Sequence, residues 1–415
     1  MNASDGDAAR LAADAVARRS YGKLVAFLAA RTRDVAAAED ALSEAFATAL
    51  AEWPARGCPA NPEAWLLTVA RRRLIDGARR RSTREGAIGQ LQLLAQEQEV
   101  AAVEGEIPDR RLALMFACAH PALDASVRAP LMLQAVVGLD AKAIASSFLM
   151  SPAAMGKRLV RAKSKIRDAG IPFRIPEREE LPARLGAVLD AVYAAFAEGW
   201  ADPGGADAAR RGLSDEALFL ARLVAELLPE EPEALGLLAL MLHADARRGA
   251  RRSGSGEFVP FAEQDLALWD WSRIEEAEGL LRRASPLGRI GRFQLEAAVQ
   301  SAHVHRRRTG EANWADLVRL YDALQALTGS PVVSINRALA IAELMGAAQG
   351  LAAMPDASAD PRLASYQPHW AARADLLTKT GASEEACRAY DIAIGLERDP
   401  AVRRWLQHQL ARSRR

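Results

Sequence analysis

The chain has few cysteines and no metal-binding pattern built from them. Its 415 residues include three cysteines, Cys58, Cys118 and Cys387, with no CxxC pair and no zinc-type Cys/His spacing. Three thiols this far apart predict neither a disulfide framework nor a metal site. We therefore expect no metal and no cofactor, and we expect each thiol to be buried or incidental.

Long apolar runs are also missing, and so are the motifs of common enzymes. No stretch is long enough to span a membrane, and the first residues, MNASDGDAAR, are acidic and lack the apolar segment of a signal peptide. We therefore expect a cytoplasmic protein with no membrane partner. His303 and His305 alternate without a third ligand, and P-loop, GxSxG and paired-carboxylate patterns are absent. The sequence predicts that the protein is not an enzyme.

Net charge is close to zero, so total charge predicts no partner. The formal charge at pH 7 is +1, but basic residues gather at 71–84 and 157–167. Local basic patches, more than net charge, indicate nucleic-acid binding.

The composition predicts an all-α fold. Half of the residues are apolar, alanine, leucine and arginine are abundant, and the alternation typical of strands is nearly absent. Loops are expected at 54–62 and 170–182, which are rich in proline, and the Gly/Ser/Arg stretch 247–256 is expected to be a mobile loop.

Two cap residues and one apolar stripe are predicted in the first 70 residues. Asp34 is expected to cap a helix in which Leu42, Phe46 and Leu50 form one stripe. Asn61 is expected to cap the next helix, with Pro62 as its first residue.

The stretch 151–167, SPAAMGKRLVRAKSKIR, has six basic residues and no acidic one. Ser151 and Pro152 predict a helix start, and a short helix at 141–148 precedes it, as in a helix-turn-helix. Helical spacing separates an apolar seam at Met155, Leu159, Ala162 and Ile166 from a basic face. Solvated helix faces usually interleave acids with bases, so this face favours DNA binding. Its members are Ala154, Lys157, Arg158, Arg161 and Lys165.

A second basic helix is predicted at 61–81, NPEAWLLTVARRRLIDGARRR. It has six arginines against Glu63 and Asp76, and Trp65 lies beside the proline-rich loop. Basic side chains next to an aromatic residue and a loop suit the backbone of unpaired DNA, although Trp65 also fits a place in the core.

The C-terminal half reads as helical segments separated by Gly, Pro and Asp turns. Residues 314–327 resemble part of 370–400, whose second helix has the pattern Ala-Tyr-x-x-Ala-x-x-Leu. This pattern is typical of a tetratricopeptide-like (TPR-like) hairpin. Grooves of helical repeats commonly bind peptides or partner helices, so a regulatory protein or peptide is an expected partner of this half.

Three motifs in order resemble one family. They are AAAEDALSEAFATALAEWP, then residues 61–81, then the helix-turn-helix at 139–167. Together they resemble an extracytoplasmic-function (ECF) sigma factor of the sigma-70 family, in the group with a long TPR-like C-terminal extension. The resemblance implies a region-two domain at 8–81, a linker at 82–107, a region-four helix-turn-helix domain at 108–170, a linker at 171–182, and the extension at 183–415.

The resemblance also implies partners and roles. The partners are core RNA polymerase and promoter DNA. The helix around Glu39, Asp40, Glu44 and Phe46 would bind the polymerase. Loop 54–62 with Asn61 would capture a flipped base of the minus-ten element. The promoter backbone would be held by Arg71, Arg72, Arg73, Arg79 and Arg80, with Asp76 orienting them. Residues 152–165 would read the minus-thirty-five element.

The chain departs from the family pattern at four positions. Ala37 and Ser43 replace an acidic residue and a glutamine, which places more of the polymerase contact on Asp40 and Glu44. Arg72 stands where an asparagine is frequent. Gly156 stands where the recognition helix often has a lysine, and a mid-helix glycine costs about 1 kcal/mol relative to alanine.

Two other functions are compatible with parts of this pattern. A helix-turn-helix regulator with a TPR-like sensor would need only one DNA-reading unit, whereas the chain has two basic units. A helical scaffold with a basic face would be expected to interleave acids along residues 151–167. A sigma factor whose extension modulates its activity is therefore the preferred hypothesis.

Overall fold

The computed structural model describes residues 3–85, 109–147, 150–177, 179–200 and 213–414. Within these ranges the backbone forms helices and no strand, apart from an isolated antiparallel bridge between Arg252 and Phe258. The predicted all-α fold is confirmed. The chain divides into two compact units, Met1–Leu223 and Val224–Arg415.

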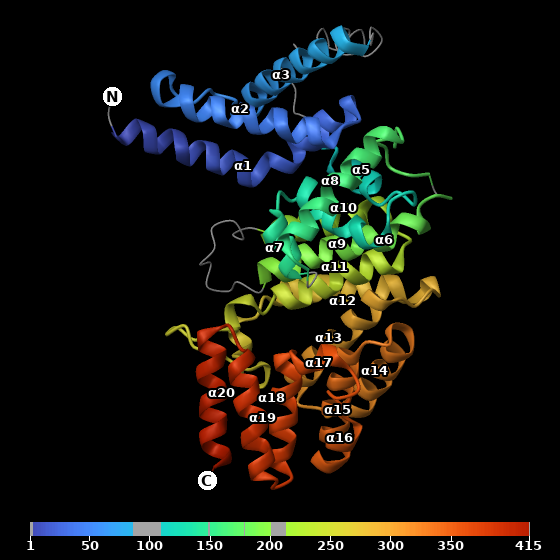
Figure 1. The fold of residues 1–415 in the computed structure, drawn as a ribbon. Coiled ribbons are helices and arrows are strands. Elements are labelled where there is room, and N and C mark those ends of the chain that lie inside the picture. Colours follow the sequence, from blue (N-terminus) through green and yellow to red (C-terminus); the bar gives the residue numbers. More distant parts are fainter. Residues whose placement is uncertain (1–2, 86–108, 148–149, 178, 201–212, 415) are drawn as a thin grey trace. The chain divides into compact units, whose positions relative to one another are not determined.

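The first unit is shown in blue to green in Figure 1. Its helices are α1 (Ala3–Thr32), α2 (Val35–Arg56), α3 (Pro62–Glu85), α5 (Arg111–Cys118), α6 (Ala125–Ala135), α7 (Ala141–Ser147), α8 (Pro152–Asp168) and α9 (Pro182–Trp200), and α10 (Leu213–Leu227) contains the division between the units. Most of the predicted linker 82–107, with its short helix, lies outside the described residues, and 82–85 continue α3. The predicted domain boundaries stay predictions.

Helices α1, α2 and α3 pack on one another. Leu24, Phe27 and Leu28 of α1 are buried. Asp34 caps α2 as predicted, since its side chain accepts a hydrogen bond from the Ala37 amide at 3.0 Å.

The predicted apolar stripe of α2 is wrong in two of its three members. Leu42 is buried, but Phe46 is only partly buried and Leu50 is exposed. The buried stripe runs through small residues instead: Ala38, Ala41, Ala45 and Ala49, ending at Trp53. Alanine lets neighbouring helices approach closely, so the closest packing does not follow the largest side chains.

The loop predicted at 54–62 is shorter than expected. Helix α2 continues through Pro54 to Arg56, and Gly57 ends it with φ +83° while its amide bonds to the Trp53 carbonyl at 2.9 Å. Proline in the last turn removes only its own donor, so the helix survives it here. Helix α3 starts at Pro62 as predicted, capped by Asn61.

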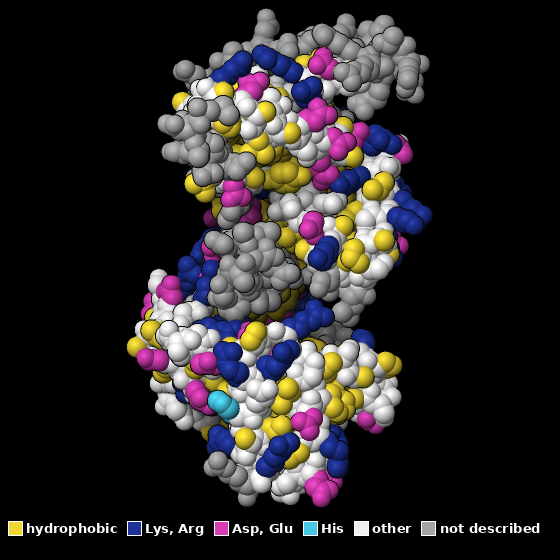
Figure 2. Space-filling model, turned by 60° about the vertical axis from the view of Figure 1, so that its left-hand side comes forward, with side chains coloured by type: hydrophobic (Ala, Val, Ile, Leu, Met, Phe, Trp, Pro, Cys, Tyr) yellow, Lys and Arg dark blue, Asp and Glu magenta, His cyan; other side chains and the backbone are white. Residues whose placement is uncertain are grey.

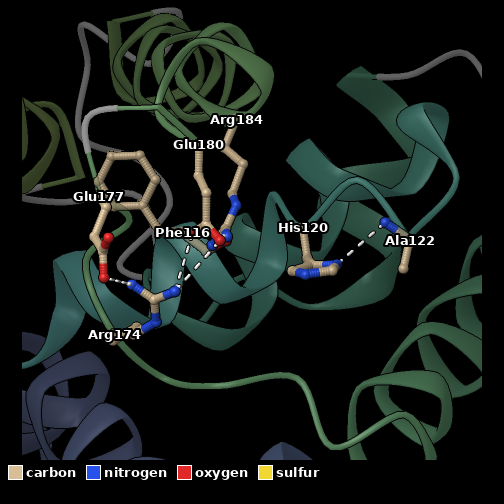
Figure 3. Close-up of polar contacts among 7 residues, drawn as sticks. All are labelled: Phe116, His120, Ala122, Arg174, Glu177, Glu180 and Arg184. Carbon is tan, nitrogen blue, oxygen red and sulfur yellow. Dashed lines mark hydrogen bonds and ion pairs between the residues drawn. The ribbon is translucent and has the colours of Figure 1, made fainter.

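The segment between α8 and α9 is tied to α5 by a buried arginine (Figure 3). The Arg184 side chain donates to the Phe116 carbonyl at 3.3 Å and pairs with Glu180 at 2.8 Å. Arg174 bonds to Glu177 and Glu180, each at 3.3 Å. Since α9 also packs on α5 and α6, it belongs to the first unit.

The second unit is shown in yellow to red in Figure 1. It contains α11 (Pro232–Asp245), α12 (Trp271–Ala284), α13 (Arg292–Thr309), α14 (Trp314–Thr328), α15 (Pro331–Met345), α16 (Ala347–Ala353), α17 (Pro361–Ala364), α18 (Gln367–Lys379), α19 (Ser383–Leu396) and α20 (Pro400–Ser413), with 3₁₀ turns η2 (Arg248–Ala250), η3 (Phe261–Glu263), η4 (Leu266–Leu268) and η5 (Ser285–Leu287).

Each helix of this unit packs chiefly on its neighbours along the chain. Successive contacts join α11 to α12 and α13, then run through α14 and α15 to α16, and from α18 through α19 to α20. The buried residues form several small clusters in succession. Left-handed glycines end α13 and α14: Gly310 (φ +77°) and Gly329 (φ +58°). The assignment as TPR-like remains a prediction.

The stretch 247–256, expected to be a mobile loop, is instead anchored. It contains η2, and the Arg252–Phe258 bridge closes a turn in which the Val259 amide bonds to the Arg251 carbonyl at 3.0 Å. Arg252 forms an ion pair with Asp399 just before α20. Glycine and serine content alone could not reveal these long-range partners.

Gly236 of α11 lies against the backbone of α13, which predicts a sharp effect of adding one methyl group. A Cβ at Gly236 would lie 2.5 Å from the Gln294 amide nitrogen. Gly236→Ala should destabilise the second unit by about 1–3 kcal/mol, because neither backbone can move aside cheaply. Urea denaturation of the full chain measures the change.

Gly395→Ala is the matched control, because Gly395 is also helical and a Cβ there meets nothing within 4 Å. It should stabilise its helix by up to about 1 kcal/mol. Equal effects of the two substitutions would contradict the close approach of α11 and α13.

Candidate nucleic-acid and polymerase interface

Helix α8 starts and packs as predicted. The Ser151 hydroxyl accepts a hydrogen bond from the Ala154 amide at 3.3 Å, and Pro152 is the first helical residue. The predicted seam is buried: Met155, Leu159, Ala162 and Ile166. This seam packs α8 on α6 and α7. The turn residues 148–149 lie outside the described residues, so the helix-turn-helix stays a prediction.

The opposite side of α8 is basic and exposed. Lys157, Arg161 and Lys165 are exposed, whereas Ala154 and Arg158 are partly buried at its edge. The Arg158 Nη1 atom lies 3.3 Å from the Met150 sulfur, directed back toward the helix start. The side chains best placed to meet a nucleic acid are therefore Lys157, Arg161 and Lys165.

Val160 also lies on this exposed face, although the sequence pattern did not predict it there. Its side chain is 65% exposed, and it shares the face with Lys157 three residues before it and Ser164 four residues after it. The sequence did contain a sign of this exposure, because Val160 belongs neither to the apolar seam nor to the basic face of the predicted helix. An exposed β-branched residue amid lysines and arginines is suited to contact the methyl group of a thymine.

Glu39 of α2, a predicted polymerase contact, lies in a buried ion pair. Its carboxylate bonds to the Nζ atom of Lys163 on α8, and the two side chains are 14% and 10% exposed. Burial raises the pKa of Glu39, and the ammonium group of Lys163 opposes this rise. At the rim, Arg167 lies 3.9 Å from Asp34. In this conformation Glu39 joins α2 to α8 and is not presented to a partner.

The other predicted polymerase contacts are more accessible. Asp40 and Glu44 are exposed one turn apart on α2, and Phe46 is partly buried. Glu44 pairs with Arg73 of α3 at 3.2 Å. Both partners of that pair are about half exposed or more, so the pair is weak and can be exchanged for another partner.

The arginines of α3 differ in their surroundings. The guanidinium of Arg71 lies 5.1 Å from the centre of the Phe27 ring, while Arg72, Arg73 and Asp76 are exposed. Arg79 and Arg80 belong to α3, but their side chains lie outside the described ones.

The start of α3 is fixed by several contacts. Asn61 is exposed, and its side-chain oxygen accepts a hydrogen bond from the Ala64 amide at 3.1 Å. Ser20 of α1 bonds to Glu63, and the rings of Trp53 and Trp65 meet edge to face, with centres 5.5 Å apart. The first turn of α3 is therefore held against α1 and α2.

Basic and acidic side chains are interspersed on the surface shown in Figure 2. On the face drawn in Figure 2, Lys and Arg side chains stand in separate groups among Asp and Glu, and they form no continuous basic surface. This agrees with the net charge of +1. Contact with DNA would therefore depend on local groups such as the exposed face of α8.

A known protein family matches most of the segment that forms the first three helices. Residues 16–84 match the family described as Sigma-70 region 2. The chain therefore contains a sigma-70 region 2 segment, and this segment supports a relationship to the sigma-70 family. Residues 184–285 match a second family, described as a family of unknown function (DUF6596).

One relative aligns with this chain over most of the length of both proteins. The chain is 37% identical to an uncharacterized protein of Rhizobium meliloti (strain 1021) over 387 residues, covering 91% of this chain and 90% of that protein. No solved structure matches. Within the described residues no cluster of three or more His, Cys, Asp or Glu residues could hold a metal ion, and no helix is long and apolar enough to cross a membrane.

The Glu39–Lys163 pair predicts a strong, non-additive effect on stability. Lys163→Met leaves a buried carboxylate without its counter-charge, and it should destabilise the first unit by about 3–5 kcal/mol. Adding Glu39→Gln should recover much of this loss. Urea denaturation of the two single variants and the double variant gives the coupling energy.

Arg73→Met is the control, because it breaks the exposed pair with Glu44. Its effect should stay within about 1 kcal/mol. If Lys163→Met lowers the free energy of unfolding no more than the control does, the Glu39–Lys163 pair is not buried in solution.

Proposed function

We propose that the protein is an RNA polymerase sigma factor of the ECF group, which binds core polymerase, recognises minus-ten and minus-thirty-five elements and helps to melt promoter DNA. The observation that carries the proposal is the sigma-70 region 2 match over α1–α3, combined with a helix α8 in the same unit whose exposed face is basic. The chemistry of RNA synthesis belongs to the polymerase, and this chain supplies recognition.

Helix α2 would supply the contact with core polymerase. Asp40 and Glu44 are exposed on it, and Phe46, which is partly buried, is part of the same proposal. Glu39 would contribute to this contact only after its ion pair with Lys163 opens. Separating a buried ion pair costs several kcal/mol. While the Glu39–Lys163 pair is intact, we therefore assign the polymerase contact to Asp40 and Glu44.

Helix α3 and the loop before it would hold the melted minus-ten element. Arg72 and Arg73 are exposed on α3, and Arg71, Arg79, Arg80 and Asp76 belong to the same proposal. Unpairing costs a few kcal/mol per base, so melting needs a pocket that captures a flipped base and cations that hold the backbone. Asn61 would act at the exposed start of α3, where its side chain already orders the backbone.

Helix α8 would enter the major groove of the minus-thirty-five element. Lys157, Arg161 and Lys165 would contact phosphates and guanine edges, and Val160 a thymine methyl group. Ala154 and Arg158 would lie at the margin of this contact, since both are partly buried. The helix-turn-helix geometry with α7 is part of this proposal.

The C-terminal helices would modulate this activity, as a TPR-like extension that receives a regulatory protein or peptide. Their succession of neighbour contacts supports this proposal, because such arrays offer extended binding surfaces. The Gly236→Ala substitution perturbs this unit alone, so it should change promoter output if the extension modulates transcription. Unchanged output from a destabilised second unit would contradict the modulation.

Run-off transcription tests the proposed function directly. Core polymerase plus this protein on genomic fragments should give promoter-specific transcripts, and the two should co-purify. Glu44→Gln should weaken binding to core by about tenfold, the order expected for loss of a charged contact. Glu384→Gln, at an exposed position of α19, is the control and should bind as the unaltered chain does.

Failure to co-purify with core, together with the absence of promoter-specific transcripts, would exclude a sigma factor.

The role of α8 is tested by the salt dependence of promoter binding. Arg161→Ala in the polymerase complex should lower the slope of log K against log salt by about 1, because one phosphate contact is lost. Arg388→Ala, at an exposed arginine of α19, should leave the slope unchanged. An unchanged slope for Arg161→Ala would show that this face of α8 does not meet DNA.

A further inference from the structure

Arg247, just after α11 in the second unit, is a largely buried arginine with only neutral partners. Its Nε atom donates to the His243 carbonyl at 3.2 Å, and its Nη2 atom donates to the Gln300 side chain at 2.9 Å. Its guanidinium lies 4.8 Å from the centre of the Phe261 ring. Within the described residues no hydrogen bond engages Nη1, so one edge of the guanidinium keeps its donors.

Neighbouring acids do not neutralise this cation. Asp245, two residues before it, is buried and paired with Arg248 and Arg273. Asp399 pairs with Arg252. Burial, together with the positive charge of Arg251, lowers the pKa of Arg247 to about 10. No carboxylate of the described residues opposes this shift.

The aromatic and histidine groups around Arg247 add no negative charge. The Phe261 ring contacts both Trp269 and His303, with centres 5.7 Å apart in each case. His303 stays neutral at pH 7, because burial lowers its pKa to about 4 and the charges of Arg306 and Arg247 act in the same direction. Beyond it, Arg306 stacks on Trp314 at 4.3 Å. The positive charge of the region is therefore carried by arginines at any physiological pH.

An unpaired donor lies beside the same ring. Trp269 is only 4% exposed, and its Nε1 atom has no hydrogen-bond partner within the described residues. Buried donors and buried charges are normally paired in folded proteins. An aromatic face satisfies a guanidinium only in part, because it offers no acceptor in the plane of the N–H groups. Trp269 lacks an acceptor for its Nε1 donor, and Arg247 lacks a counter-charge. An oxygen anion beside the Phe261 ring would supply both.

We propose that the second unit binds the oxyanion of a small molecule, a phosphate or carboxylate group, on Arg247 beside Phe261 and Trp269. The guanidinium supplies the charge and its remaining N–H donors, Trp269 supplies a further donor, and Phe261 holds both in place. The site suits a small ligand, because a polymer backbone would require cations that stand clear of the surface. Such a ligand would bind the second unit, away from the DNA and polymerase contacts that we propose for the first unit.

Thermal unfolding and tryptophan fluorescence of the full chain test this site. The probes are inorganic phosphate and succinate, each titrated against chloride at equal ionic strength. At about ten times its Kd, a bound probe should raise the Tm of the second unit by about 3–6 °C. Saturation by phosphate alone assigns a phosphate ligand, and saturation by succinate alone assigns a carboxylate.

Three variants localise the effect. Arg247→Met keeps the apolar stem and removes the charge, and it should weaken the probe at least tenfold. Trp269→Phe keeps the ring and removes one donor, and it should weaken the probe severalfold. Arg283→Met, at an exposed arginine of α12, is the matched control and should bind as the unaltered chain does.

Two results would overturn the proposal. One is the absence of any saturable effect of either probe on the unaltered chain. The other is equal binding by the Arg247→Met and Arg283→Met proteins. If Arg247→Met fails to fold, the Trp269→Phe and Arg247→Lys variants test the site instead. Probe binding as strong as that of the unaltered chain in both variants would show that Arg247 has a purely structural role.

Discussion

The first unit depends on one buried ion pair, between Glu39 of α2 and Lys163 of α8. Taking both charges out of water costs several kcal/mol per ion, and only a close, well-oriented partner offsets this cost. The pair therefore tolerates one register of α2 against α8 and penalises others. It also gives α8 three distinct sides: the apolar seam on α6 and α7, the Lys163 side on α2, and the basic side toward solvent.

The same constraint explains how the chain treats its buried arginines. Arg111 is paired with Asp109 at 2.7 Å and with Glu216. Arg184, 2% exposed, is held by the Phe116 carbonyl and Glu180 (Figure 3). These two are structural, since each joins segments distant in sequence and each has a carboxylate. Arg247 joins α11 to α13 in a similar way but lacks the carboxylate, and this difference is why we propose it as a binding group.

Much of the local structure could be predicted because it depends on neighbouring residues. Asp34, Asn61 and Ser151 cap their helices as expected, and the seam of α8 is buried at all four predicted positions. Caps and amphipathic faces are set by spacings of three and four residues, which are visible in the sequence. The predicted stripe at Leu42, Phe46 and Leu50 failed where close helix packing selected the alanines instead.

The residues alone are enough to predict that the chain is helical, where α3 and α8 begin, and which face of α8 is basic. The packing of the helices, in contrast, is needed to see that Glu39 faces Lys163, that Val160 is exposed among the cations, and that Arg252 pairs with Asp399. Partners 124 and 147 residues apart leave no periodic signal. They meet because helix packing brings them together, and burial then decides which charges must be paired.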